Sequence, residues 1–126
     1  IGNLAINYLG HIYNKEFLNY VYSSGDVLAM PSKLETFGLI GIESILSGTP
    51  CVAFSNTGLE EIIIHRANGY LSKYLDESDY ENGLKLFLNT KDKVDLKNDR
   101  EELKKKFDNK KIYLEYLNFY ESLLIN

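Results

Sequence analysis

The stretch that decides the fold runs Ser32-Lys33-Leu34-Glu35-Thr36-Phe37-Gly38-Leu39-Ile40-Gly41-Ile42-Glu43. It holds two carboxylates eight positions apart, on either side of a Phe-Gly pair that opens an apolar, helix-like run. A strand-like run, 26–30, comes just before it, and Gly48-Thr49-Pro50 leads into a second strand just after it. A strand that runs into a helix N-terminus is a place where backbone amides hold an anion such as a phosphate. Because carboxylates accept hydrogen bonds from hydroxyls, the stretch predicts a site for a ligand with both kinds of group.

The spacing of the two glutamates limits the chemistry that they can share. If the whole interval were helical, roughly 12 Å of helix rise would separate Glu35 from Glu43. That is too far for a shared proton, a single metal ion or the acid/base pair of a glycosidase. It suits the two ends of one extended ligand, such as a nucleotide-diphospho-sugar. We expect the sugar, the diphosphate and the ribose to meet, in that order, Glu35, the amides of Phe37, Gly38 and Leu39, and Glu43.

A plainer interpretation of these residues stays open. Ser32-x-x-Glu35 has the spacing of a capping box, and a glutamate in the first turn of a helix interacts favourably with the helix dipole. Glu43 would then lie on an exposed helix face. The order of strand, Phe-Gly, second glutamate and Gly-Thr-Pro favours the ligand site over this interpretation.

Composition sets the class of protein. The chain has 126 residues, 44% of them hydrophobic and 25% charged, which is enough for one domain, or part of one, with a real core. Its net charge of -4 argues against a nucleic-acid surface, which needs a basic patch. No apolar run reaches the roughly 18 residues that cross a bilayer, and no segment has the pattern of a signal peptide. The single cysteine, Cys51, lies in an apolar strand and is expected to be a core residue in a reducing compartment.

Short apolar strands alternate with helical patterns along the first three quarters of the chain. We expect strands at 6–10, 26–30, 50–54 and 70–71. We expect helical segments at 15–22, with Asn14 as its cap, at 36–46, 59–65 and 78–88, and over 94–125 with an interruption near Asp108-Asn109. This alternation predicts an α/β fold, a Rossmann-like parallel sheet with helices on both faces. Ligands of such sheets bind at the carboxyl ends of the strands.

The ordered motifs resemble the C-terminal, donor-binding domain of the GT-B glycosyltransferases, and within them the retaining GT4-like family, glycosyl transferases group 1. The motifs are Tyr8-Leu9-Gly10, Ser24-Gly25-Asp26-Val27, Pro31-Ser32, the E-x7-E pair Glu35 and Glu43, Ser47-Gly48-Thr49-Pro50, Glu61-Ile62-Ile63 and Asn68-Gly69-Tyr70-Leu71. The resemblance covers about 6–90, with helices at about 94–125. It implies that 1–126 is part of a C-terminal nucleotide-sugar-binding domain.

The resemblance also implies roles for these residues. It places Glu35 at the reacting centre of the donor sugar, as the catalytic residue, and Glu43 at the ribose. It places the backbone of Phe37, Gly38 and Leu39 at the sugar and the diphosphate. The expected reaction is hexosyl transfer (EC 2.4) with retention of configuration, and it needs no metal and no cofactor besides the donor substrate. The family's Arg and Lys pair at the diphosphate lies upstream of this sequence, so the isolated chain is expected to be inactive.

The turn after the first expected strand, His11-Ile12-Tyr13, is the segment that the resemblance places at the base. An acceptor, a glycan or a lipid-linked molecule, would bind through a missing N-terminal domain. The expected role is cell-surface glycan biosynthesis, of polysaccharide, lipopolysaccharide or capsule, in the cytoplasm or at the inner face of its membrane. Peripheral membrane association, the oligomeric state, the base, the donor sugar, the acceptor and the linkage are all left open.

Two other functions are compatible with the same fold class. One is a non-catalytic Rossmann-like interaction module, for instance of the response-regulator kind. Such a module needs an acidic cluster at the strand ends, whereas Asp26 begins its strand instead of ending it. The other is a GT-B relative with different chemistry, such as a sugar-nucleotide epimerase, which only the upstream domain would distinguish.

Overall fold

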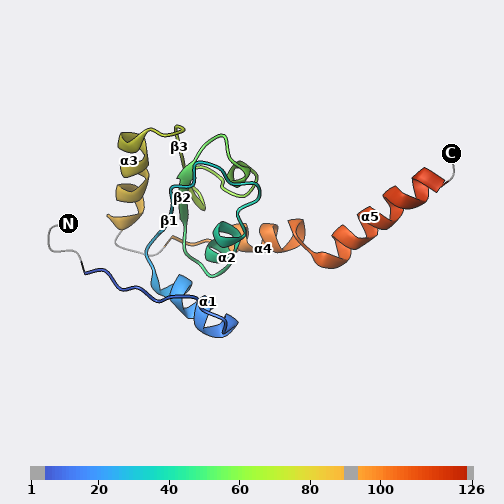
Figure 1. The fold of residues 1–126 in the computed structure, drawn as a ribbon, viewed down its shortest axis with the longest axis horizontal. Helices are drawn as coiled ribbons and strands as arrows, with labels where there is room; N and C mark the ends of the chain where they lie inside the picture. Colours follow the sequence, from blue (N-terminus) through green and yellow to red (C-terminus); the bar gives the residue numbers. More distant parts are fainter. Residues whose placement is uncertain (1–4, 90–93, 125–126) are drawn as a thin grey trace.

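The computed structural model describes residues 5–89 and 94–124 (Figure 1). The chain alternates strands and helices through its middle and ends in helices, as Figure 1 shows. In chain order the elements are α1 (Lys15–Ser24), β1 (Leu28–Met30), α2 (Leu39–Leu46), β2 (Cys51–Phe54), the 3-10 helix η1 (Gly58–Glu61), β3 (Gly69–Ser72), α3 (Glu77–Leu88), α4 (Lys97–Lys106) and α5 (Asn109–Leu124).

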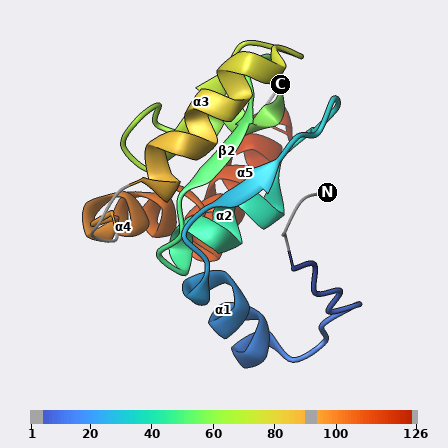
Figure 2. The same cartoon turned by 90° about the vertical axis from the view of Figure 1, so that its left-hand side faces the viewer.

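The sheet is parallel and three-stranded, in the order β1-β2-β3. Its central strand pairs Val52 with Ala29 on one side and with Tyr70 on the other. Helix α3 covers one face of the sheet, whereas α2 and α4 lie on the other face (Figure 2). The predicted α/β fold, with a parallel sheet and helices on both faces, is therefore confirmed.

The alternation of side chains along β2 divides the core between the two faces. Cys51 and Ala53 point toward α2 and α4 and belong to the larger apolar cluster, which includes Ile45 and Leu103. Val52 points the other way and packs with aromatic residues of β3 and α3. All four residues of β2 are buried, because a strand in the middle of a two-faced parallel sheet has no solvent side.

The predicted strand at 6–10 is wrong. Residues 5–14 have no regular secondary structure, and Tyr8 is 95% exposed. A strand needs a neighbour to pair its backbone groups, and none of the three strands in the described ranges pairs with 6–10. The hydrophobic pattern of this segment is typical of a strand, but the described part of the chain offers it no ladder.

The predicted helices exist, but some begin elsewhere. Helix α1 begins after Asn14, whose side chain accepts a hydrogen bond from the Phe17 amide at 2.8 Å, as predicted. Helix α3 is capped by Asp76, which accepts from the Asp79 amide, and not by Ser78, whose spacing of three from Glu81 also fits a capping box. The expected helical turn at 59–65 is the shorter η1, and the long C-terminal helix is two helices, divided as predicted near Asp108. Its expected end at Ile125 lies outside the described residues.

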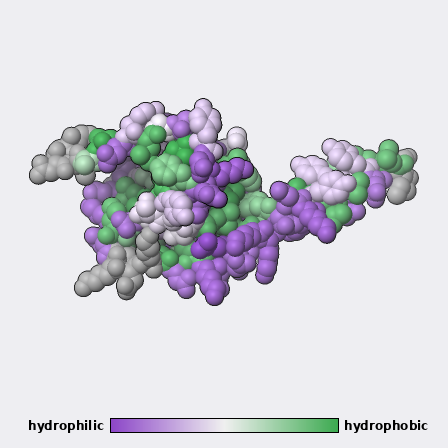
Figure 3. All heavy atoms as spheres, turned by 90° about the horizontal axis from the view of Figure 1, so that it is seen from below, coloured by the Kyte–Doolittle hydropathy of each residue, from purple (hydrophilic) through white to green (hydrophobic). Residues whose placement is uncertain are grey.

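Helix α5 projects away from the rest of the molecule (Figure 1). None of its residues is buried, although the helix carries many aromatic and aliphatic side chains. Hydrophobic and hydrophilic residues both lie at its surface in Figure 3. Across the described ranges, no helix combines the length and the hydropathy that a membrane span requires.

Candidate functional site

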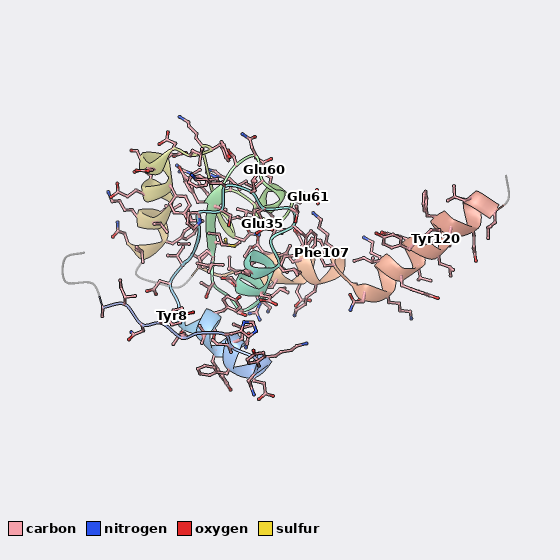
Figure 4. The ribbon with its side chains drawn as sticks, in the orientation of Figure 1. Tyr8, Glu35, Glu60, Glu61, Phe107 and Tyr120 are labelled. Carbon is pink, nitrogen blue, oxygen red and sulfur yellow. The ribbon has the colours of Figure 1, made fainter. Side chains whose placement is uncertain are left out.

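The loop between β1 and α2 carries the first glutamate. Figure 4 shows Glu35 in the body of the domain. Its Oε1 accepts hydrogen bonds from the amides of Phe37 and Gly38, at 3.3 and 3.1 Å. The carboxylate therefore bonds the turn just before α2, whose N-cap residue is Gly38, and lies near the helix N-terminus, where a negative charge is favoured by the helix dipole. It occupies two of the three amides that the resemblance assigns to the donor.

Helix α2 begins at Leu39, three residues later than predicted. Gly38 is its N-cap residue and has a left-handed backbone, with φ of 84°. Only residues 39–43 of the interval between the two glutamates are helical, so the expectation of continuous helix rise from Glu35 to Glu43 is wrong. The alternative capping box Ser32-x-x-Glu35 does not form at this helix, because its N-cap residue is Gly38 and both members of the box precede it.

The η1 segment also contacts the loop between β1 and α2 and holds its shape. The Gly58 amide donates to the carbonyl oxygen of Glu35 at 2.8 Å. Leu59 is fully buried beneath Gly38, so closely that a Cβ on this glycine would lie 2.3 Å from Leu59 Cδ2. The loop shape thus depends on contact with a segment more than twenty residues later.

A cavity of about 480 Å³ lies between α1, α2 and the segment before α1. This volume falls in the range of small-molecule sites. The cavity brings together the expected base-binding residues and the expected ribose ligand. Its lining consists of His11, Ile12, Tyr13, Lys15, Leu18, Asn19, Tyr22, Glu43, Leu46 and Ser47.

The cavity gathers one group of the predicted site residues and leaves the other outside. His11, Ile12, Tyr13 and Glu43 line it, and the rings of His11 and Tyr13 pack edge to face, with centroids 4.4 Å apart. Glu35 and the backbone of 37–39 are not in this lining and lie at the opposite end of the first turn of α2. The first half of α2, 39–43, therefore connects the loop that carries Glu35 to Glu43 in the cavity lining.

Tyr22 is the functional candidate that sequence reasoning missed. Its hydroxyl donates to Glu43 Oε2 at 3.1 Å. Burial, with the Glu43 carboxylate beside it, raises the pKa of the Tyr22 hydroxyl to about 12. The signal in the sequence was its spacing of three from Asn19, which places both side chains on one face of α1 toward α2.

Among residues 5–89 and 94–124, the side chains that commonly ligate metals do not gather into a metal centre. Cys51 is fully buried, and burial raises its thiol pKa to about 12, in keeping with a core residue. Within the described ranges, no group of three or more His, Cys, Asp or Glu side chains could hold a metal ion.

A family model decides the affiliation of the chain. The model described as Glycosyl transferases group 1 matches residues 3–110, a range that includes both glutamates, the cavity residues and the whole sheet. The chain belongs to the glycosyl transferases group 1 family. Its fold is that of the C-terminal domain of a GT-B glycosyltransferase, as the resemblance predicted.

Curated relatives of this group 1 chain are longer proteins. An uncharacterized glycosyltransferase of Methanocaldococcus jannaschii is 44% identical over 62 residues, which are 49% of this chain and 16% of that protein. A D-inositol 3-phosphate glycosyltransferase of Nocardia farcinica is 35% identical over 79 residues, 63% of this chain and 18% of that protein. The group 1 chain thus spans less than a fifth of either relative.

Solved structures match the group 1 chain over most of its length. Sucrose-phosphate synthase from Thermosynechococcus elongatus superposes with a TM-score of 0.75 at 30% identity, covering 87% of this chain and 28% of that one. HepE of Anabaena, in complex with UDP and glucose, superposes with a TM-score of 0.65 at 22% identity, covering 81% and 29%. The second likeness is one of fold alone.

Proposed function

We propose that this chain is the donor-binding part of a retaining, GT4-like glycosyltransferase that moves a hexosyl group from a nucleotide-diphospho-sugar to an acceptor. The observation that carries the proposal is the cavity between α1 and α2. It is lined by His11, Ile12 and Tyr13 together with Glu43, although these residues are about thirty positions apart in the sequence. An aromatic and imidazole wall suits a nucleobase, and a carboxylate suits the ribose hydroxyls.

The orientation of the donor follows from the direction of α2. With the nucleoside in the cavity beside Glu43, the diphosphate and the sugar run toward the N-terminal end of the helix. Amide groups there favour a negative charge. The sugar then reaches Glu35, which is the proposed catalytic residue, and the backbone of Phe37, Gly38 and Leu39.

The contact of Glu35 with its own amides has a consequence for catalysis. A donor that takes the amides of Phe37 and Gly38 must displace the carboxylate that occupies them. The displaced carboxylate becomes available to accept a hydrogen bond from a sugar hydroxyl. Donor binding and the exposure of Glu35 are therefore one coupled event, and amides that face the leaving diphosphate stabilise its charge.

The acceptor and the cellular role are proposed from the family to which the chain belongs. We propose a glycan or lipid-linked acceptor held by another domain, in the biosynthesis of a cell-surface polysaccharide, lipopolysaccharide or capsule at the cytoplasmic side of the membrane. The complex of HepE with UDP and glucose supports a nucleotide-sugar ligand for this fold. We further propose that the 126-residue chain by itself binds a donor without turning it over.

Isothermal titration calorimetry of the 126-residue chain with UDP, GDP and ADP tests the proposal. We expect one nucleotide to bind and Glu43→Ala to weaken it about tenfold or more, since a charge-assisted hydrogen bond contributes about 1.5–3 kcal/mol. Glu121→Ala, on the projecting helix α5, is the matched control and should leave binding unchanged. Binding of no nucleotide, or equal binding by both variants, would overturn the proposed site.

A further inference from the structure

Helices α1 and α2 face each other through polar side chains beside the cavity. The Tyr22 hydroxyl donates to Glu43 Oε2 at 3.1 Å, and the Ser47 hydroxyl donates to Asn19 Oδ1 at 2.7 Å. The two contacts lie on adjacent turns, because Asn19 and Tyr22 are three residues apart and Glu43 and Ser47 are four apart. All four side chains line the cavity.

From this geometry we propose that Tyr22 is a positioning residue, which orients the Glu43 carboxylate toward the ribose hydroxyls of the donor. The inference rests on the proposed function, since it concerns the same site. It extends that function to the specificity of the site for a ribonucleotide over a 2′-deoxyribonucleotide.

The need for a positioning group follows from the place of Glu43. This residue lies on the exposed side of α2, and its long side chain has several rotamers in water. A ribose diol is recognised well only if both carboxylate oxygens are presented in a fixed plane. The hydrogen bond from Tyr22 holds one rotamer of Glu43 before the ligand arrives, while each oxygen keeps a lone pair for the ligand.

The hydroxyl of Tyr22 is suited to this task because it stays protonated. Its pKa is raised to about 12 by burial and by the neighbouring carboxylate. The group therefore donates to Glu43 throughout the neutral range and cannot become a competing anion. Lys15, His11 and Tyr13 are the other titratable side chains in the lining of the cavity.

The backbone at Tyr22 is held by contacts that do not involve its hydroxyl. The hydroxyl of buried Thr49 donates to the carbonyl oxygen of Tyr22, and this bond ties the end of α1 to the turn between α2 and β2. Tyr22→Phe thus removes one hydrogen-bond donor and leaves the helix anchored. The substitution separates orientation of Glu43 from folding of α1.

The test compares the dissociation constants of a nucleotide and its 2′-deoxy form by calorimetry on the 126-residue chain. UDP, GDP and ADP are each paired with 2′-deoxy-UDP, 2′-deoxy-GDP and 2′-deoxy-ADP. In the unsubstituted chain we expect the ribonucleotide that binds to be preferred about tenfold or more, as the loss of a hydrogen bond to a charged group implies. In Tyr22→Phe the preference should fall to about twofold to threefold, with the thermal unfolding midpoint unchanged.

Two further variants make the result specific. Tyr20→Phe, on the same helix and exposed, is the matched control and should keep the full preference. In Glu43→Gln the further change Tyr22→Phe should have no additional effect on the preference, because the two residues act as one unit. In NMR titration of the tyrosine hydroxyls, Glu43→Gln should lower the pKa of Tyr22 from about 12 toward its ordinary value.

The outcomes distinguish failure of the positioning role of Tyr22 from failure of the proposed function. A preference that survives in Tyr22→Phe, or a Tyr22 pKa that Glu43→Gln does not lower, overturns the positioning role and leaves the proposed function standing. Binding of no nucleotide by the unsubstituted chain overturns the proposed function, and the inference with it.

Discussion

Among single residues, Gly38 connects the sequence motif most directly to a backbone requirement. Its φ of 84° is strained for any residue with a side chain, and a Cβ would meet Leu59 at 2.3 Å. We expect Gly38→Ala to lower the free energy of unfolding by about 2–4 kcal/mol, through left-handed strain and overpacking together. Urea denaturation followed by circular dichroism measures this loss.

Gly48→Ala separates the two causes. Gly48 also has a left-handed backbone, with φ of 95°, but the nearest group to its Cβ position is Arg100 Nη1 at 3.9 Å. Its substitution should cost only the strain, about 1–2 kcal/mol. Equal losses in the two variants would contradict the close packing of Gly38 on Leu59.

Among the elements, α4 and α5 differ sharply in how they relate to the core. Leu103 on α4 is 6% exposed and belongs to the larger apolar cluster, whereas Leu117 on α5 is 39% exposed. The same change to alanine should therefore cost about 2–5 kcal/mol of unfolding free energy at Leu103 and less than about 0.5 kcal/mol at Leu117. Denaturant midpoints of the two variants give the comparison, and a comparable loss at Leu117 would show that α5 packs on the body in solution.

The elements also show how far local sequence predicts this fold. Asn14 and α1 were predictable because an N-cap acts within one turn, and β2 because four apolar residues bounded by turns form a buried strand. The absence of a strand at 6–10 was not, since pairing depends on a neighbour far along the chain or outside it. The cap of α3 by Asp76 instead of Ser78 reflects a choice between two acceptors only two residues apart.

The candidate site divides in the same way. The acids and the Phe-Gly pair became candidates because of their order along the chain, and their roles at the donor stay predictions. The hydrogen bonds of Glu35 to Phe37 and Gly38, and of Tyr22 to Glu43, depend on side-chain rotamers and on the packing of α1 against α2. Periodicity specifies neither, so these contacts were found only in the structure.

For the whole molecule, the position of α5 determines the shape. A compact chain of 126 residues has a radius of gyration of about 14 Å, whereas a helix of sixteen residues alone is about 24 Å long. Because α5 projects from the body and buries none of its residues, we expect small-angle X-ray scattering to give a radius clearly above about 14 Å, with a long tail in the distance distribution (Figure 1).

Deletion of 109–126 tests whether α5 is the cause of the larger radius of gyration. The shortened chain keeps both apolar clusters and the sheet, so its radius should fall to about 13 Å and the tail should shrink. The remaining extension belongs to the segment before α1, of which 11–13 line the cavity. If the 126-residue chain already scatters as a compact particle and the deletion does not shorten the tail, then α5 folds back onto the body, and its exposed apolar side chains are covered from within the chain.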